Sequence, residues 1–255
     1  MALQIEQFMC RADNFGVLVH DPQSGQTAII DAPEERPILE AIERTGWTPT
    51  LLLTTHHHGD HVEANLTLKQ QFNLEIVGPE REKAKIPGID RAVKEGDVVR
   101  LGDRPIRVIE TPGHTSGHVC YHFFEDGVVF TADTLFALGC GRLFEEKPPV
   151  MFQSLKKLTE LPLETVVYCG HEYTAANARF ALSVDPTNSA LKKRATEIEH
   201  LLADGKPTLP TTIGNEMATN PFLRWHDPVI RANLGMEDAS DAEVFAEIRK
   251  RKDVA

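Results

Sequence analysis

Apolar residues in the first two thirds of the chain come in short runs that are separated by turn residues. The runs 15–20 and 27–31 are apolar and rich in β-branched residues, and the turn cluster 21–25 lies between them, so they predict a β-hairpin. The same reading predicts further strands over 50–55, 74–77, 106–110, 119–124, 128–131 and 166–168, and helices over 37–45 and 62–72. Alternating strands and helices indicate an α/β domain.

The last third changes character. Residues 174–183, 189–202 and 241–252 have helical periodicity, and no strand signal accompanies them. Ser240 and Glu243 form the pattern of a capping box at the start of the final helix. Residues 205–219 are rich in Pro, Thr and Gly and predict an extended connection. We therefore predict an α/β domain over residues 1–173 and a helical domain over residues 174–255.

Composition and charge narrow the class of protein. A hydrophobic content of 41% and a charged content of 25% are ordinary for a globular protein, which argues against wholesale disorder. No apolar run approaches the roughly 20 residues that cross a bilayer, and residues 1–7 lack the features of a signal peptide. The net charge of −11 disfavours nucleic acid as a partner. We expect a cytoplasmic, monomeric protein whose four cysteines, none in a CxxC pair, are free thiols.

Four of the eleven histidines and one aspartate fall between residues 56 and 61. His56, His58 and Asp60 alternate, which places their side chains on one side of an extended loop, and His61 follows directly. Imidazole and carboxylate groups hold zinc-like metals, and one ion needs three or four of them. This segment alone offers more ligands than one ion uses.

The arrangement of a strand, a turn and a candidate ligand then recurs three times. His114 follows the strand and turn over 106–113, Asp133 follows 127–132, and His171 follows 165–170. Loops at one end of a sheet are where a rigid scaffold brings functional groups together. The pattern therefore predicts a metal centre built from loops at the ends of several strands.

The segment Thr55-His-x-His-x-Asp-His61 resembles the signature of the metallo-β-lactamase superfamily. That resemblance implies a four-layer αβ/βα sandwich of two mixed sheets with helices outside, and two divalent metal ions. It implies as ligands His56, His58 and His114 for the first metal, Asp60, His61 and His171 for the second, and Asp133 as the bridge. His57, His118 and His122 are expected outside the ligand set. Zinc is the first expectation, with iron or manganese as alternatives, because these donors do not distinguish them.

Four further segments, 139–144, 169–174, 219–224 and 249–253, resemble the glyoxalase II (hydroxyacylglutathione hydrolase) family over nearly the whole chain. The resemblance implies hydrolysis of S-D-lactoylglutathione to glutathione and D-lactate, the second step of methylglyoxal detoxification. It implies glutathione contacts from Arg142, Tyr173, Arg249 and Lys252, with Phe144 where a tyrosine is common. Ala132 likewise stands where glycine is common.

The charge pattern bears on the glutathione contacts. Residues 249–252 form the densest basic run of an acidic chain, at the end of a predicted helix. Such cations can simply complement the helix dipole, for roughly 0.3–1 kcal/mol each. Because a glutathione thioester carries carboxylates, we favour Arg249 and Lys252 as a clamp for them and expect Lys250 and Arg251 to be solvated.

The expected chemistry is attack by hydroxide on the thioester. Two metals lower the pKa of a shared water from about 15.7 towards about 7, and Asp60 and Asp133 orient the resulting hydroxide. The leaving thiolate, with a thiol pKa of about 8.5, needs little help from an acid. The alternatives are a mononuclear-iron persulfide dioxygenase, a lactonase or β-lactamase, and a metal-binding scaffold without catalysis.

Overall fold

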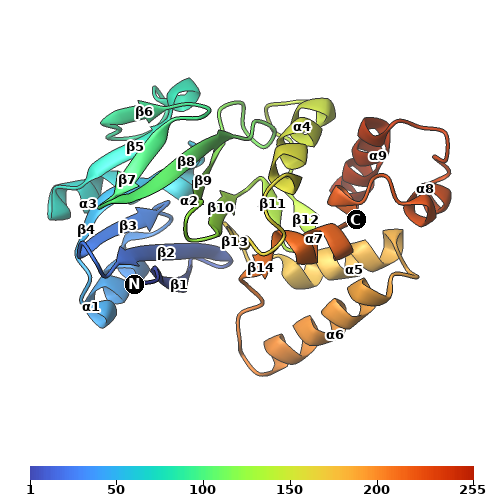
Figure 1. The fold of residues 1–255 in the computed structure, drawn as a ribbon, viewed down its shortest axis with the longest axis horizontal. Helices are drawn as coiled ribbons and strands as arrows, with labels where there is room; N and C mark the ends of the chain where they lie inside the picture. The colour runs from blue at the N-terminus through green and yellow to red at the C-terminus, as the bar shows by residue number, and fades with distance from the viewer. The chain divides into compact units, whose positions relative to one another are not determined.

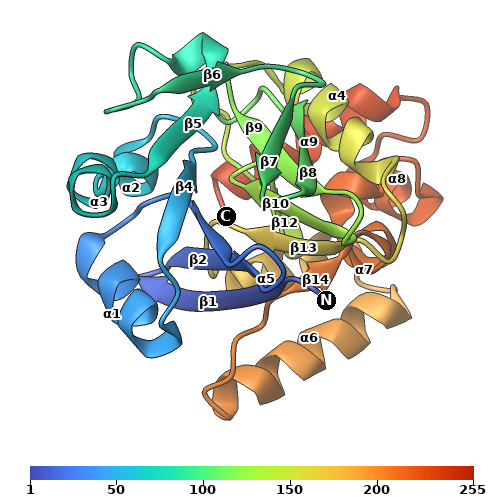
Figure 2. The same ribbon diagram turned by 60° about the vertical axis from the view of Figure 1, so that its left-hand side comes forward.

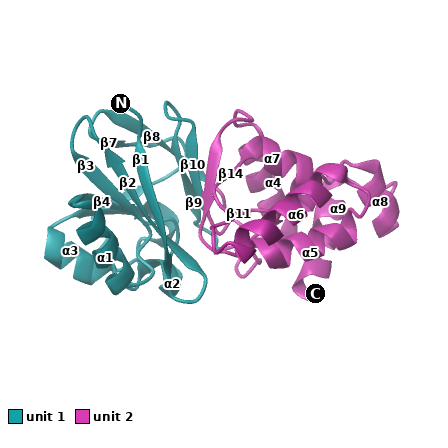
Figure 3. Cartoon of the chain, turned by 90° about the horizontal axis from the view of Figure 1, so that it is seen from below, with its two compact units in different colours: residues 1–110, 115–131 teal, residues 111–114, 132–255 magenta.

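The computed structural model describes residues 1–255 (Figure 1). The chain forms two compact units: unit 1 contains residues 1–110 and 115–131, and unit 2 contains residues 111–114 and 132–255 (Figure 3). Residues 132–173, which we predicted as part of the α/β domain, thus belong to the same compact unit as the C-terminal helices.

Unit 1 begins with a six-stranded sheet in the order β1-β2-β3-β4-β5-β6. Its strands are β1 (Gln4–Cys10), β2 (Asn14–Asp21), β3 (Gln26–Ile30), β4 (Pro49–Leu53), β5 (Glu75–Pro79) and β6 (Arg91–Val93). The hairpin of β2 and β3 is confirmed, with Val17 opposite Ile30. Neighbours from β1 to β3 are antiparallel and those from β3 to β6 are parallel.

Two helices cover one face of this sheet. Helix α1 (Glu35–Thr45) connects β3 to β4, and α3 (Asn65–Phe72) lies between β4 and β5; Figure 2 shows both on the same side of these strands. One buried cluster joins the inward positions of the strands, such as Ile29 and Leu52, to Ile38 of α1 and Leu68 of α3. Parallel connections through helices and apolar inward positions are what the alternating pattern predicted.

The single helix predicted over 62–72 is wrong. The structure has a short helix α2 (Gly59–Val62) and then α3, which starts at Asn65. Ala32 explains the break, because its N–H donates to the carbonyl of His61 (2.8 Å) and its carbonyl accepts the N–H of Ala64 (3.1 Å). These backbone groups are bound to Ala32 instead of continuing one helix.

A second set of strands in unit 1 is antiparallel, in the order β10-β9-β8-β7. Its members are β7 (Val98–Leu101), β8 (Arg104–Glu110), β9 (Val119–Phe123) and β10 (Val128–Ala132). Tyr121 on β9 is fully buried, and its hydroxyl donates to the carbonyl of Thr54 at 2.8 Å. This bond fixes the segment that follows β4.

Unit 2 contains two short strand pairs and six α-helices. The strands are β11 (Leu135–Phe136) with β12 (Gly139–Cys140), and β13 (Val166–Cys169) with β14 (Thr211–Thr212). The helices are α4 (Pro148–Thr159), α5 (Thr174–Val184), α6 (Ser189–Ala203), α7 (Ile213–Thr219), α8 (Pro228–Leu234) and α9 (Asp241–Asp253). Short 3₁₀ turns occur at Glu80–Glu82 in unit 1 and Pro221–Leu223 in unit 2.

The C-terminal helices bury small and aromatic side chains against one another. Ala181 of α5 and Leu191 of α6 belong to one buried cluster, and the rings of Phe152 and Phe245 join α4 to α9. The capping box of α9 is confirmed. The prediction of an extended connection over residues 205–219 is wrong for its last part, because helix α7 begins at Ile213, directly after its N-cap residue Thr212. No helix of the chain has both the length and the apolar character needed to span a membrane.

Candidate metal centre

Unit 1 carries four of the predicted donors on the loop after β4 and on α2. His56 and His61 are buried, and His58 and Asp60 are half-buried. The ring centroid of His56 lies 4.1 Å from that of His61 and 4.8 Å from that of His58. The loop thus brings His56 and His58 together, and the first turn of α2 (Gly59–Val62) adds His61.

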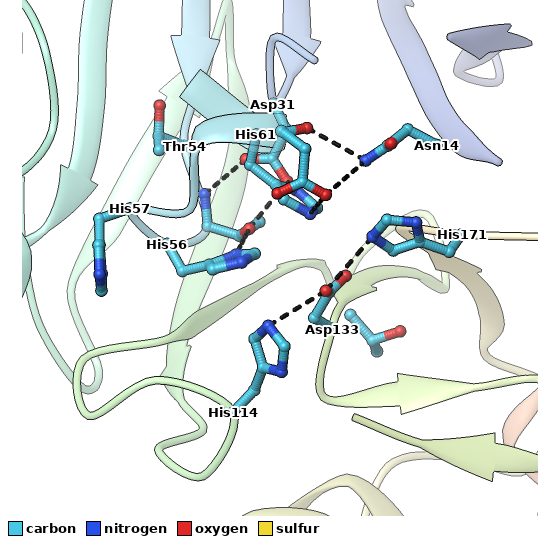
Figure 4. A network of polar contacts seen from close by, with 12 residues as sticks. Asn14, Asp31, Thr54, His56, His57, His61, His114, Asp133 and His171 are labelled. Carbon is cyan, nitrogen blue, oxygen red and sulfur yellow. Dashed lines mark hydrogen bonds and ion pairs between the residues drawn. The ribbon is translucent and has the colours of Figure 1, made fainter. Parts of the chain in front are cut away.

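Asp31, at the end of β3, fixes one of these imidazoles (Figure 4). Its carboxylate accepts the N–H and the hydroxyl of Thr55, both at 2.8 Å, and lies 2.8 Å from Nδ1 of His61. A carboxylate can only accept, so Nδ1 of His61 carries the proton and Nε2 carries the lone pair that a metal needs. Asp31 thus selects the metal-binding tautomer of His61.

Asn14 acts on the carboxylate of the same loop. It is buried, and its Nδ2 donates to the carbonyl and to Oδ2 of Asp60, both at 3.1 Å. Neither Asn14 nor Asp31 was predicted from the sequence. Asp31 could have been found, because it follows a buried strand directly, as the other predicted ligands do; Asn14 gave no such signal.

His57 lies outside the donor group. Oε2 of the buried Glu82 accepts its backbone N–H (2.7 Å) and lies 2.8 Å from its Nδ1. Figure 4 shows its ring directed away from the rings of His56 and His61. His118 stacks on His56 at 4.9 Å, while His122 is buried on β9, where burial and the nearby Arg107 lower its pKa to about 4.

Unit 2 carries the other three predicted donors, all buried. Oδ2 of Asp133 lies 3.2 Å from Nε2 of His114 and 3.4 Å from Nε2 of His171, so one carboxylate oxygen lies between two imidazoles (Figure 4). Ligand atoms that share a tetrahedral zinc ion stand about 3.3 Å apart, from bond lengths near 2.0–2.1 Å. The spacing fits an oxygen that shares a cation with each ring.

The tautomer of His114 strengthens this fit. Its Nδ1 lies 2.8 Å from the backbone carbonyl of Arg142, which can only accept a hydrogen bond. In neutral His114 the proton is therefore on Nδ1, and the lone pair on Nε2 faces the oxygen of Asp133. Two lone pairs at 3.2 Å repel each other unless a cation or a proton lies between them. The donors present thus suit a divalent metal.

The backbone around Asp133 is tightly constrained. A Cβ at Gly141 would stand 1.9 Å from the carbonyl oxygen of Asp133, so only glycine fits there. Ala132, which precedes the carboxylate, has a φ of 38°, in the region that favours glycine. This conformation explains why glycine is common at that position in the family that the chain resembles.

Two aromatic residues lie beside the donors of unit 2. Tyr173 stacks on His171 with centroids 4.8 Å apart and planes 6° apart. Phe144 is 61% exposed, and its ring lies 5.2 Å from that of His114. Both are therefore placed where a bound molecule could contact them.

The basic residues of unit 2 differ in their surroundings. Arg249 is only 5% exposed; its Nη1 donates to the carbonyl of Cys140 (3.0 Å), and its Nε and Nη2 contact Oδ1 of Asp253 (3.0 and 2.8 Å). Arg142 is exposed and also pairs with Asp253, at 3.5 Å. Nζ of Lys252 lies 5.2 Å from the ring centroid of Phe180, and burial together with Arg249 and Arg179 lowers its pKa.

The four cysteines are free and buried, as expected. Burial raises the pKa of Cys140 to about 11 and that of Cys169 to about 12, so both are thiols at neutral pH. Neither cysteine belongs to the groups of side chains that could hold a metal ion, which consist of histidines, aspartates and glutamates.

Comparison with known proteins identifies the family of this chain. Residues 16–171 match the model of the metallo-β-lactamase superfamily, and residues 172–255 match that of the hydroxyacylglutathione hydrolase C-terminus. A curated hydroxyacylglutathione hydrolase from Mesorhizobium japonicum is 76% identical over 99% of both chains. The chain belongs to the hydroxyacylglutathione hydrolase family. The predicted metallo-β-lactamase fold and the resemblance to glyoxalase II are confirmed.

Two solved structures are similar to this chain in fold. The crystal structure of ETHE1 from Myxococcus xanthus has a TM-score of 0.70 and 25% identity, and the match covers 97% of this chain and 90% of that one. The structure of TTHA1623 in a di-iron-bound form has a TM-score of 0.63 and 27% identity, covering 84% and 98%. The two family models meet between residues 171 and 172, directly after the last predicted ligand of the hydroxyacylglutathione hydrolase chain.

Proposed function

We propose that this chain hydrolyses S-(2-hydroxyacyl)glutathione thioesters, with S-D-lactoylglutathione as the substrate and glutathione and D-lactate as products. The observation that carries the proposal is full-length identity of 76% to a protein named hydroxyacylglutathione hydrolase. The match of residues 172–255 to the model of the hydroxyacylglutathione hydrolase C-terminus supports it, because that model carries the family's name and lies outside the metallo-β-lactamase match over residues 16–171. The cytoplasmic location and the monomeric state belong to the same proposal.

The donors of the two units are proposed to form one dinuclear centre. In this assignment the seven ligands are His56, His58 and His114 for one divalent metal, Asp60, His61 and His171 for the other, and Asp133 between them. The tautomers fixed on His61 and His114 support it, as does the position of Oδ2 of Asp133 between two imidazoles. A relative at 27% identity is described in a di-iron-bound form. Zinc remains our first choice, with iron or manganese as alternatives.

The chemistry follows from these groups. Bound divalent metals lower the pKa of a water molecule from about 15.7 towards about 7 and polarise a carbonyl group. Asn14 holds Oδ2 of Asp60 by a hydrogen bond at 3.1 Å, so that Asp60, with Asp133, can orient the attacking water. The thioester carbon is attacked, the C–S bond breaks, and glutathione leaves as a thiolate that needs little help from an acid.

The glutathione moiety is proposed to lie along the basic residues of unit 2. Lys252 and Arg179 line a cavity of about 310 Å³ with Phe180, which supports an anionic group there. Asp253 occupies the fork of Arg249 and contacts Arg142, so a carboxylate of the substrate would compete with Asp253 for both. Tyr173 and Phe144 complete the proposed contacts.

The test is hydrolysis by the metal-loaded protein. We expect S-D-lactoylglutathione to yield free thiol and D-lactate in equal amounts, and His58→Ala to lose metal and turnover together. Elemental analysis of the same sample identifies the metal. Oxygen uptake on glutathione persulfide, and hydrolysis of a lactone and a β-lactam, test the rival activities. A fully loaded protein that releases no thiol from the thioester contradicts the proposal.

A further inference from the structure

The hairpin of β11 and β12 connects all three predicted metal ligands of unit 2. At its end, Gly141 packs on the backbone of Asp133, and the next carbonyl, of Arg142, fixes the tautomer of His114. On its other side, the ring of Phe136 meets two rings edge-on: its centroid lies 6.0 Å from that of His171 and 5.3 Å from that of Tyr173. A shift of this hairpin would therefore tilt the ligands and the tyrosine together.

The turn of the hairpin is strained. Leu135 pairs with Cys140 and Phe136 with Gly139, which leaves Ala137 and Leu138 as a two-residue loop. Leu138 has a φ of 58°, a conformation that favours glycine or asparagine. Such a residue persists only where the surrounding structure holds it, and strain of this kind collects at functional sites.

Helix α7 and the residue after it hold this turn from outside. Glu216 accepts the N–H of Leu138 at 2.7 Å, and Nδ2 of Asn220 donates to the carbonyls of Phe136 (3.2 Å) and Gly139 (3.0 Å). Asn220 also donates to Glu216 (2.9 Å), and Thr211 donates to the second oxygen of Glu216 (2.8 Å). Both Glu216 and Asn220 are fully buried.

Burying the carboxylate of Glu216 costs free energy, because the charged group loses its contact with water. Its hydrogen bonds must offset that cost. Burial raises the pKa of Glu216, and its hydrogen bonds oppose that shift. Three donors converge on it, and its helix α7 lies in the segment that the sequence read as an extended connection. A buried group with this many engaged atoms specifies one geometry, because any other arrangement leaves a polar atom without a partner.

We propose that Glu216 and Asn220 are positioning residues of the metal centre, acting through the β11–β12 hairpin on Asp133, His114 and His171. The inference rests on the proposed function, because the hairpin matters to chemistry only if these three side chains hold metal. It gives the C-terminal segment a second role beside contact with glutathione: it sets the orientation of ligands that precede it in the chain.

The test variant is Asn220→Asp. It keeps the side-chain volume and the oxygen that accepts the N–H of Phe222, but it removes the donor to Phe136 and Gly139 and places a second carboxylate beside Glu216. A control for the amide-to-carboxylate change is Asn233→Asp, since the exposed Asn233 donates from Nδ2 to a backbone carbonyl, that of Val184 (3.1 Å), away from the hairpin. Thr211→Val, which removes only one donor from Glu216, is the milder variant if Asn220→Asp does not fold.

Two measurements need no thioester. We expect metal affinity, from competition with a chelator, to fall about 10- to 100-fold in Asn220→Asp and less in Thr211→Val, as for other groups that orient ligands. In the metal-free protein, amide exchange of Leu138 should accelerate in both variants and stay unchanged in Asn233→Asp. Asn220→Asp with wild-type metal affinity, or with Leu138 exchange like that of the control, overturns the inference. Failure of the wild type to hydrolyse the thioester would instead count against the proposed function alone.

Discussion

Asp31→Asn tests whether the tautomer of His61 controls metal binding. The carboxylate of Asp31 contacts three groups at 2.8 Å, namely the N–H and the hydroxyl of Thr55 and Nδ1 of His61. Asparagine keeps one acceptor oxygen for Thr55, but its NH₂ group then faces Nδ1 of His61. Two donors cannot share that contact, so His61 adopts the tautomer in which Nε2 carries the proton and offers no lone pair.

The size of the effect follows from the metal's need for Nε2. Loss of a group that orients a ligand costs about 10- to 100-fold in metal affinity, which is about 1.4–2.7 kcal/mol. Asp21→Asn is the matched control. Asp21 is also a buried carboxylate at the end of a strand, and it accepts bonds from the N–H of Gln23, the hydroxyl of Ser24 and the guanidinium of Arg104. Both variants should lose stability, but only Asp31→Asn should lose metal affinity.

The assay is competition with a chelator, followed at equilibrium by elemental analysis of the protein. Two-bond ¹H–¹⁵N spectra of the metal-free protein report the tautomer of His61 directly. If Asp31→Asn holds metal as tightly as Asp21→Asn does, the reasoning from the tautomer is refuted. A normal affinity with a changed tautomer would show that His61 is not a ligand.

Three further outcomes are expected. The first is that His122→Phe should weaken the dependence of stability on pH. The pKa of His122 is about 4 in the fold and 6.5 for the free side chain, so the unfolded chain binds more protons between these two values. The free energy of unfolding of the wild type therefore falls by up to roughly 2–3 kcal/mol as the pH drops from 6.5 to 4. Urea denaturation of the metal-free wild type and variant measures the difference, and equal slopes would contradict it. Phe144→Tyr restores a hydroxyl beside the site and should lower KM for the thioester up to about fivefold at unchanged kcat, from a hydrogen bond of about 1 kcal/mol; a raised KM would exclude the contact. Lys252→Met should raise KM about tenfold and weaken its salt dependence, with metal content unchanged, and an unaltered KM would remove Lys252 from the proposed clamp.

The sequence predicted the elements whose side chains are periodic and missed those whose order comes from tertiary contacts. The β2–β3 hairpin and the capping box of α9 are local patterns and are confirmed. The break between α2 and α3 depends on Ala32, which is distant in sequence, and α7 lies in a segment rich in Pro, Thr and Gly. Strand β1 was missed because its residues are mostly polar or only partly buried.

The site divides in the same way. Residues 56–61 form a local motif, and each remaining predicted donor follows a strand, so their residue types were readable from the sequence. The groups that orient them were not. Asn14, Glu216 and Asn220 act through hydrogen bonds between segments 46 to 84 residues apart, and nothing in the sequence near them indicates a partner. The metal identity also stays a proposal, because histidine and carboxylate donors accept several divalent ions.

The stack of Tyr173 on His171 couples the orientations of the two rings. One face of the phenol ring is covered by the imidazole, so only its outer face and hydroxyl edge are available to a thioester. Any tilt that a cation imposes on the imidazole passes to the phenol. A substitution that turns His171 would therefore also change the surface that Tyr173 presents, although the tyrosine itself is unaltered.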